Sequence, residues 1–196
     1  MACHQVKQQQ QGTLANVFAA HCAKQRISAT CRILNRLDKD TTGAVLIAKN
    51  AFAAAALTGH VDKLDLAVAA GRLEPPDGFI DAPIGQPDRT DPRRCVCEDG
   101  QHAKTQYHTA AYGLGYSIVQ CILHTGRTHQ IRVHLSSLGH PLLGDSLYDG
   151  DCSQIKRQAL HCVRLIFMHP IRKKRIKIEA ELPQDMQKFI RDCVKR

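Results

Sequence analysis

The sequence predicts a single α+β domain with a mixed, mainly antiparallel central sheet that is flanked by helices. Apolar runs of strand length come in adjacent pairs, joined by a turn around Gly113 in one pair and around Pro170 in the other. Amphipathic runs of helical spacing stand at both ends of the chain and between these pairs. The length of 196 residues suits one well-buried domain, and neither an internal repeat nor a clear linker divides it.

The first half of the chain is predicted to alternate helices and short strands. Thr13 precedes one amphipathic run and Asn50 precedes another, and both residue types cap helix N-termini. Five prolines make residues 74–101 rich in loops. We expect helices over 13–24 and 50–59, a buried strand over 43–49 and a further strand over 64–70.

The second half is predicted to contain two strand pairs and two helices. The last helix places Met186, Phe189 and Cys193 at helical spacing, so we expect it to dock on the core. The predicted elements are strands over 104–112 and 116–123, a helix over 128–138 that ends at Gly139, a hairpin of 163–168 with 175–182, and a helix over 183–196.

The net charge of +9 is unevenly distributed. Residues 156–196 carry 12 Lys and Arg against 4 Asp and Glu, whereas residues 1–155 are nearly neutral. A basic segment on a neutral body favours a polyanionic partner, although a solvated charged surface without a partner is the open alternative.

Composition also bears on the compartment. No apolar run is long enough to span a membrane, and the Gln-rich residues 1–11 lack the apolar core of a secretory signal. The nine cysteines are odd in number and contain no CxxC pair, which favours reduced thiols. We therefore expect a cytoplasmic protein without a membrane span.

The segment HTGRTHQIRVHLSSLGH, residues 124–140, suggests either a metal site or a cationic surface. His129 and His134 are five positions apart, which puts them about 140° apart around a helix, and no cysteine or carboxylate pattern completes a ligand set. We expect no metal here. The glycine turn with Arg127, and the helix start near Thr128, suit a phosphate instead.

Arg132 lies one turn into this predicted helix, where it can face inward. An inward arginine needs an acidic partner because an unpaired buried charge is costly. Asp38, in the segment NRLDKDTTG, is the candidate, since a strand-entry loop can hold a carboxylate while leaving it reachable. The open alternative is that Asp38 only caps a turn.

Three segments carry a resemblance to a known family. NRLDKDTTGAVLIAKN (35–50), GRTHQIRVHLSSLGHPLLGDSLY (126–148) and RQALHCVRLIFMHP (157–170), in this order, closely resemble the RluA-type pseudouridine synthases. The resemblance implies a pseudouridine synthase catalytic domain over 12–196. It implies an isomerase, an intramolecular transferase, that converts uridine in RNA to pseudouridine without a metal or an organic cofactor.

The resemblance also implies roles for individual residues. Asp38 matches the catalytic aspartate of the family, which attacks C1′ or removes a proton next to it, and Arg132 matches the arginine that pairs with it. Weaker assignments to substrate or RNA binding are Arg36, Thr41, Arg127, Thr128, His129 and Leu160. The implied partner is rRNA or tRNA, and we expect a monomer.

The chain departs from the family pattern in two places. The family has a tyrosine in a K-x-Y-x-A strand, where this chain has KLDLA with Asp65 at the tyrosine position. Only eleven residues precede Gly12, where family members have further strands, so the chain looks N-terminally short: either it is a truncated product, or its sheet is smaller with one exposed edge. The alternative function is therefore a catalytically impaired relative that binds RNA without modifying it.

Overall fold

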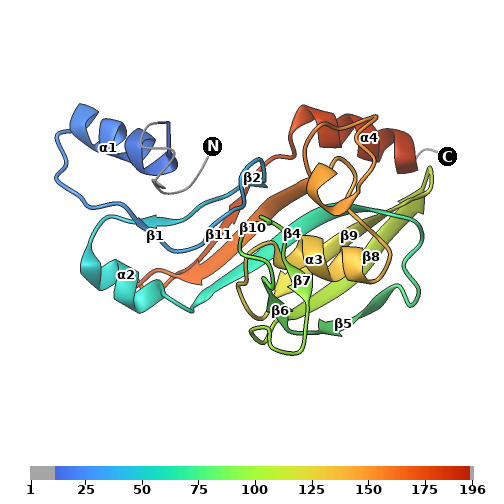
Figure 1. Ribbon diagram of the computed structural model, residues 1–196. Coiled ribbons are helices and arrows are strands. Elements are labelled where there is room, and N and C mark those ends of the chain that lie inside the picture. The colour runs from blue at the N-terminus through green and yellow to red at the C-terminus, as the bar shows by residue number, and fades with distance from the viewer. Residues whose placement is uncertain (1–11, 195–196) are drawn as a thin grey trace.

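The structure, a computed structural model, describes residues 12–194, so the predicted Gln-rich extension over 1–11 lies outside the described residues. Its centre is a seven-stranded sheet in the order β11-β10-β4-β9-β8-β5, with β2 beside β10 (Figure 1). Only the β2–β10 pair is parallel, which confirms the mixed, mainly antiparallel sheet. The strands are β2 (Thr42–Gly43), β4 (Val61–Ala70), β5 (Asp77–Asp81), β8 (Lys104–Gly113), β9 (Tyr116–Leu123), β10 (Leu160–Met168) and β11 (Arg175–Glu179).

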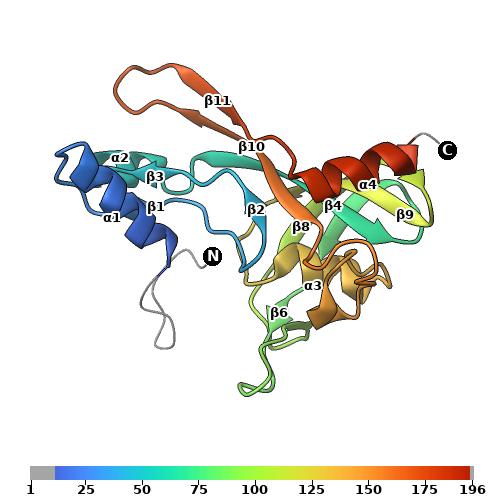
Figure 2. The same ribbon diagram turned by 90° about the horizontal axis from the view of Figure 1, so that it is seen from above.

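Helices cover the sheet and one end of the molecule. Figure 2 shows α3 and α4 against the body of the sheet, while α1 and α2 lie together at the opposite end. The helices are α1 (Leu14–Lys24), α2 (Ala51–Leu57), α3 (Gln130–Ser137), α4 (Gln184–Val194) and the short 3-10 helix η1 (Ser146–Tyr148). Two small ladders complete the fold: β1 (Arg32–Ile33) with β3 (Ile47–Ala48), and β6 (Ile84–Gly85) with β7 (Cys95–Val96).

Strand alternation divides the core into two layers. On β4, Ala67 and Ala69 pack with Ile131 and Leu135 in one cluster, on the side of α3. Val68, between them in sequence, points to the other face and packs with residues of α4. Met186, Phe189 and Cys193 are buried there, which confirms the predicted docking of the C-terminal helix.

The predicted helix caps are confirmed. The Thr13 hydroxyl accepts from the backbone N–H of Asn16, and the Asn16 side chain accepts from the backbone N–H of Thr13, which makes a capping box. The Asn50 side chain accepts from the backbone N–H of Ala53 at 2.8 Å. Both helices thus start where their capping residues predicted.

One prediction about strands is wrong. The expected single strand over 43–49 is two short strands, because β2 pairs with β10 while β3 pairs with β1. The segment 74–101 is loop-rich, as predicted, and it also contains the short strands β5, β6 and β7. Its prolines lie outside these strands, so no ladder N–H is lost.

Two buried histidines make the stability depend on pH. His134 donates to the carbonyl of Ala82, His161 faces the carbonyl of Ala180, and burial lowers the pKa of both rings. The unfolded chain takes up these protons near pH 6.5, whereas the folded chain takes them up only at lower pH. The stability contribution is therefore complete above about pH 6.5 and is lost as the pH falls, by up to about 1.4 kcal/mol per pH unit for each histidine.

Urea unfolding at a series of pH values checks this expectation. The free energy of unfolding should decrease steadily on acidification, and His134→Gln should reduce the slope. His60→Gln is the control, because His60 is exposed and its replacement should leave the slope unchanged. A wild-type slope that stays flat through this range would contradict the expectation.

Candidate active site

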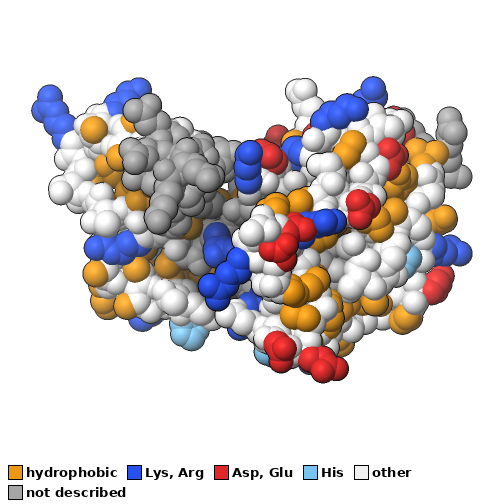
Figure 3. Space-filling view, in the orientation of Figure 1, with side chains coloured by type: hydrophobic (Ala, Val, Ile, Leu, Met, Phe, Trp, Pro, Cys, Tyr) orange, Lys and Arg blue, Asp and Glu red, His pale blue; other side chains and the backbone are white. Residues whose placement is uncertain are grey.

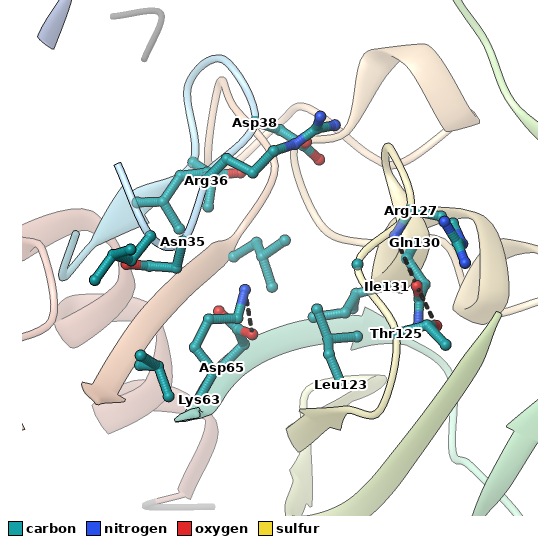
Figure 4. A pocket seen from close by; sticks show the side chains of 16 residues that line it. Asn35, Arg36, Asp38, Lys63, Asp65, Leu123, Thr125, Arg127, Gln130 and Ile131 are labelled. Atoms are coloured by element: carbon teal, nitrogen blue, oxygen red, sulfur yellow. Dashed lines mark hydrogen bonds and ion pairs between the residues drawn. The ribbon is translucent and has the colours of Figure 1, made fainter. Parts of the chain in front are cut away.

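A cavity of about 310 Å³ opens between the sheet, the start of α3 and the loop that precedes β2. Val61, Lys63 and Asp65, at alternate positions of β4, face it from the floor. Figure 4 shows Arg36 and Asp38 on the loop above this floor. The other lining residues are Leu34, Asn35, Leu37, Thr41, Leu123, Thr125, Gly126, Arg127, Gln130, Ile131 and Leu160.

A tight turn presents Asp38 to this cavity. The backbone N–H of Thr41 donates to the carbonyl of Asp38 at 3.0 Å, and Asp40 adopts a φ of 66°, which an aspartate tolerates. The buried side chain of Gln158 holds the turn from below, because its amide donates to the Lys39 carbonyl at 2.6 Å and to the Thr41 hydroxyl at 3.0 Å. Sequence reasoning missed Gln158, although it stands in the motif RQALHC.

The loop that carries Asp38 is fastened to the sheet by the parallel pairing of β2 with β10. The Thr42 hydroxyl lies 2.7 Å from Nδ1 of His161, its partner across the ladder. Gly43 has a φ of 124°, and a Cβ there would lie 2.4 Å from the backbone nitrogen of Cys162. Only glycine permits this approach, which explains the glycine of the TTG sequence.

Arg132 faces inward from α3, as predicted, and its side chain is only 6% exposed. Its Nη1 lies 3.8 Å from Oδ2 of Asp38, so the structure brings the two predicted catalytic residues together. Its closer partner is Asp145, which accepts from Nε at 2.6 Å and from Nη2 at 2.7 Å. Burial disfavours the charged form of Arg132, but the bonds with Asp145 outweigh this and raise its pKa.

Asp145 and Tyr148 are site residues that sequence reasoning missed. Both stand in the segment HPLLGDSLY, directly after the arginine motif, and an acid there was the available signal. The Tyr148 ring lies 4.9 Å from Cζ of Arg132, and its hydroxyl lies 2.9 Å from Nδ1 of His129. His129 thus contacts Tyr148, whose ring packs on Arg132, and it does not line the cavity.

The basic residues predicted to bind RNA lie at the rim. Arg36 donates to the hydroxyl of Thr128 at 2.8 Å, which joins two positions 92 residues apart. Arg127 donates through Nε to the carbonyl of His102 at 2.9 Å. Leu160 is buried and contributes an apolar surface to the floor. The binding roles of these residues stay predictions.

Comparison with known proteins identifies the family. The sequence profile that describes RNA pseudouridylate synthases matches residues 3–137. The chain belongs to the RNA pseudouridylate synthase family. This confirms the resemblance drawn from its motifs.

Several relatives in this family cover most of the chain. YhcT of Bacillus subtilis, an uncharacterized RNA pseudouridine synthase, is 43% identical over 199 residues, which cover 97% of this chain and 66% of YhcT. YjbO of the same organism, also an uncharacterized RNA pseudouridine synthase, is 42% identical and covers 92% and 65%. Ribosomal large subunit pseudouridine synthase D of Nitrosomonas europaea is 38% identical and covers 89% and 55%. The chain thus spans less than two thirds of the length of these relatives.

Solved structures of the family share the fold. Human RNA pseudouridylate synthase domain containing 1 aligns with a TM-score of 0.67 at 26% identity, covering 83% of this chain and 79% of that one. Human RNA pseudouridylate synthase domain containing 4 aligns with a TM-score of 0.77 at 23% identity, covering 95% and 84%, and at this identity it bears on the fold alone. The predicted α+β fold class is confirmed.

Asp65, which stands where the family motif has a tyrosine, lies on the cavity floor. Its side chain is 3% exposed and lies 3.4 Å from Nζ of Lys63. Burial raises the pKa of Asp65, Lys63 opposes this, and Asp38 adds only a small further rise. Burial, rather than the neighbouring Asp38 carboxylate, is thus the main cause of the raised pKa of Asp65.

Cys162, on β10 beside Asp65, is buried. Burial, with Asp65 beside it, raises the pKa of the Cys162 thiol to about 12, so the nucleophilic thiolate is scarce near neutral pH. Among residues 12–194, no three His, Cys, Asp or Glu side chains are arranged to hold a metal ion.

Within residues 12–194, no helix combines the length and the apolar character required to cross a bilayer.

Basic side chains line part of the hollowed face seen in Figure 3, with some acidic side chains beside them. Lys and Arg side chains gather along the hollow between the end that carries α1 and α2 and the end that carries α3 and α4. Arg36 and Arg127 belong to the cavity lining. Such a surface suits the phosphates of a nucleic acid.

Proposed function

We propose that this chain is an RNA pseudouridine synthase that isomerises uridine within a structured RNA, with Asp38 as the reacting carboxylate. The observation that carries the proposal is the placement of Asp38 at a cavity with both polar and apolar lining residues, 3.8 Å from the buried Arg132. The cavity has room for one pyrimidine ring, and Leu123, Ile131 and Leu160 provide apolar contacts for its faces.

The chemistry assigns separate tasks to the residues of the site. The target nucleotide must leave its stack, and contacts of Arg36 and Arg127 with the RNA backbone offset that cost. The C1′–N1 bond then breaks, the uracil turns, and its C5 bonds to C1′. Asp38 either attacks C1′ or removes an adjacent proton, and Arg132, held by Asp145, fixes its position.

The identity of the RNA is part of the proposal. The relative from Nitrosomonas europaea is named for the large ribosomal subunit, which supports rRNA, ahead of tRNA, as the first substrate to examine. Action as a monomer, a cytoplasmic location, independence from cofactors and the domain bounds of 12–196 stay predictions.

A single-turnover assay tests the proposed function. Purified protein is incubated with total RNA from cells of the same organism that lack the gene. Pseudouridine is then mapped through a chemical adduct that stops reverse transcription. New stops at defined uridines are expected, and their absence at every uridine would contradict the proposal.

A second candidate function is RNA binding without modification, and Asp65 is the observation that favours it. A buried carboxylate on the cavity floor cannot stack on a base as an aromatic ring does. Under this alternative, the wild-type protein produces no stops but still binds RNA with an affinity that decreases with salt.

A further inference from the structure

The Asp65 carboxylate has an unmet hydrogen-bonding capacity. No donor among the described residues forms a hydrogen bond with its Oδ2, although the side chain is 3% exposed. The great majority of buried polar groups in proteins are hydrogen-bonded, and leaving one unsatisfied destabilises the folded state. A buried carboxylate of this kind therefore requires an explanation.

The strands on either side of Asp65 offer its carboxylate only thiol donors. Its partners across the sheet are Cys121 on β9 and Cys162 on β10. A thiol is only a weak donor, so these neighbours compensate the carboxylate poorly. Burial accordingly raises the pKa of Asp65. The remaining approach to the carboxylate is from the cavity.

Lys63 stands beside Asp65 on the same face of β4, because the two residues are two positions apart. Its Nζ lies 3.4 Å from Oδ2, and it forms no hydrogen bond with any other described residue. The cavity floor thus presents an acceptor and a donor side by side, as Figure 4 shows. The pairing edge of uracil presents the complementary pair, a donor at N3–H beside an acceptor at O4.

We propose that Asp65 and Lys63 together recognise the pairing edge of the target uracil, with Asp65 accepting from N3–H and Lys63 donating to O4. This inference rests on the proposed function, because it assumes that the cavity receives a uridine. Cytosine presents the opposite order, an acceptor at N3 beside an amino donor. It would set a lone pair against the carboxylate and an amino group against the ammonium group, so Asp65 and Lys63 determine specificity.

Nucleotide binding tests the inference without any turnover. The full chain is titrated with uridine 5′-monophosphate, cytidine 5′-monophosphate and 3-methyluridine 5′-monophosphate, and the amide signals of β4 are followed by NMR. We expect the uridine nucleotide to bind at least about tenfold more tightly than the other two, because each of these leaves the buried carboxylate unpaired.

Variants assign the discrimination to the two side chains. Asp65→Ala and, separately, Lys63→Met should reduce the affinity for the uridine nucleotide to that for the 3-methyl analogue. Asp62→Asn is the matched control, since Asp62 is exposed on the opposite face of the same strand, and it should keep the wild-type preference.

Equal wild-type affinities for the uridine and 3-methyluridine nucleotides would overturn the inference, as would a preference that survives both variants or β4 signals that do not respond. These outcomes are separable from the proposed function. A preference for the uridine nucleotide without any modified RNA would support the inference and contradict the proposed enzymatic function. Modified RNA without a preference for the uridine nucleotide would support the enzymatic function and contradict the inference.

Discussion

Replacing Asp38 by Asn will lower the single-turnover rate of pseudouridine formation by about 10³-fold or more. The amide has nearly the shape of the carboxylate, but it can neither attack C1′ effectively nor accept a proton. Because Asp38 lies over the cavity and is not part of the basic rim, RNA binding should change little. The rate is measured on the uridine mapped in the RNA assay, and affinity is measured by filter binding.

Asp40→Asn is the matched control for this experiment. Asp40 lies in the same turn, is exposed, and has a φ of 66°, a conformation that asparagine also adopts. The control removes the same charge two positions away without disturbing the turn. A rate for Asp38→Asn within a few-fold of wild type would remove Asp38 from the chemistry, whatever the RNA.

Replacing Asp145 by Ala will lower the free energy of unfolding by about 3–5 kcal/mol, because it leaves the Arg132 guanidinium buried without its main partner. The two hydrogen bonds that are lost, at 2.6 and 2.7 Å, are the shortest contacts of Arg132. The activity should fall as well. Asp145 binds Nε and Nη2 of Arg132 and thereby orients the guanidinium so that Nη1 faces Asp38. Urea unfolding and the single-turnover rate are the measurements.

A double variant separates stability from catalysis at this pair. Arg132→Met combined with Asp145→Leu removes both charges, so it should be more stable than Asp145→Ala while remaining inactive. Glu179→Gln is the control, because the pair of Glu179 with Lys177 is exposed and its loss should leave the stability unchanged. A loss below about 1 kcal/mol for Asp145→Ala would show that Arg132 does not depend on Asp145.

Local patterns in the sequence determined most of the elements and the two central site residues. Helices α1 and α2 begin at the capping residues Thr13 and Asn50, because a cap acts on N–H groups within its own turn. The strand pair β8–β9 and the amphipathic helix α4 follow from periodicities that need no distant partner. Asp38 and Arg132 were predicted as site residues through family motifs, and the structure brings them together.

Tertiary structure alone decided how Asp38 and Arg132 are held. Gln158 reaches the Asp38 turn across more than a hundred residues, because β2 pairs in parallel with β10. The division of 43–49 between β2 and β3 has the same origin, since the two halves pair with different strands. Strand propensity does not specify a partner, so no local pattern contained either result.

The role of Asp65 also depends on tertiary structure. The sequence placed an aspartate at the position of the family tyrosine, which by itself suggested only lost activity. The fold places that carboxylate on the cavity floor, where Nζ of Lys63 lies 3.4 Å from Oδ2 without forming a hydrogen bond to it. Burial and hydrogen-bond satisfaction depend on what packs around a residue, and for Asp65 those neighbours come from three different strands of the sheet.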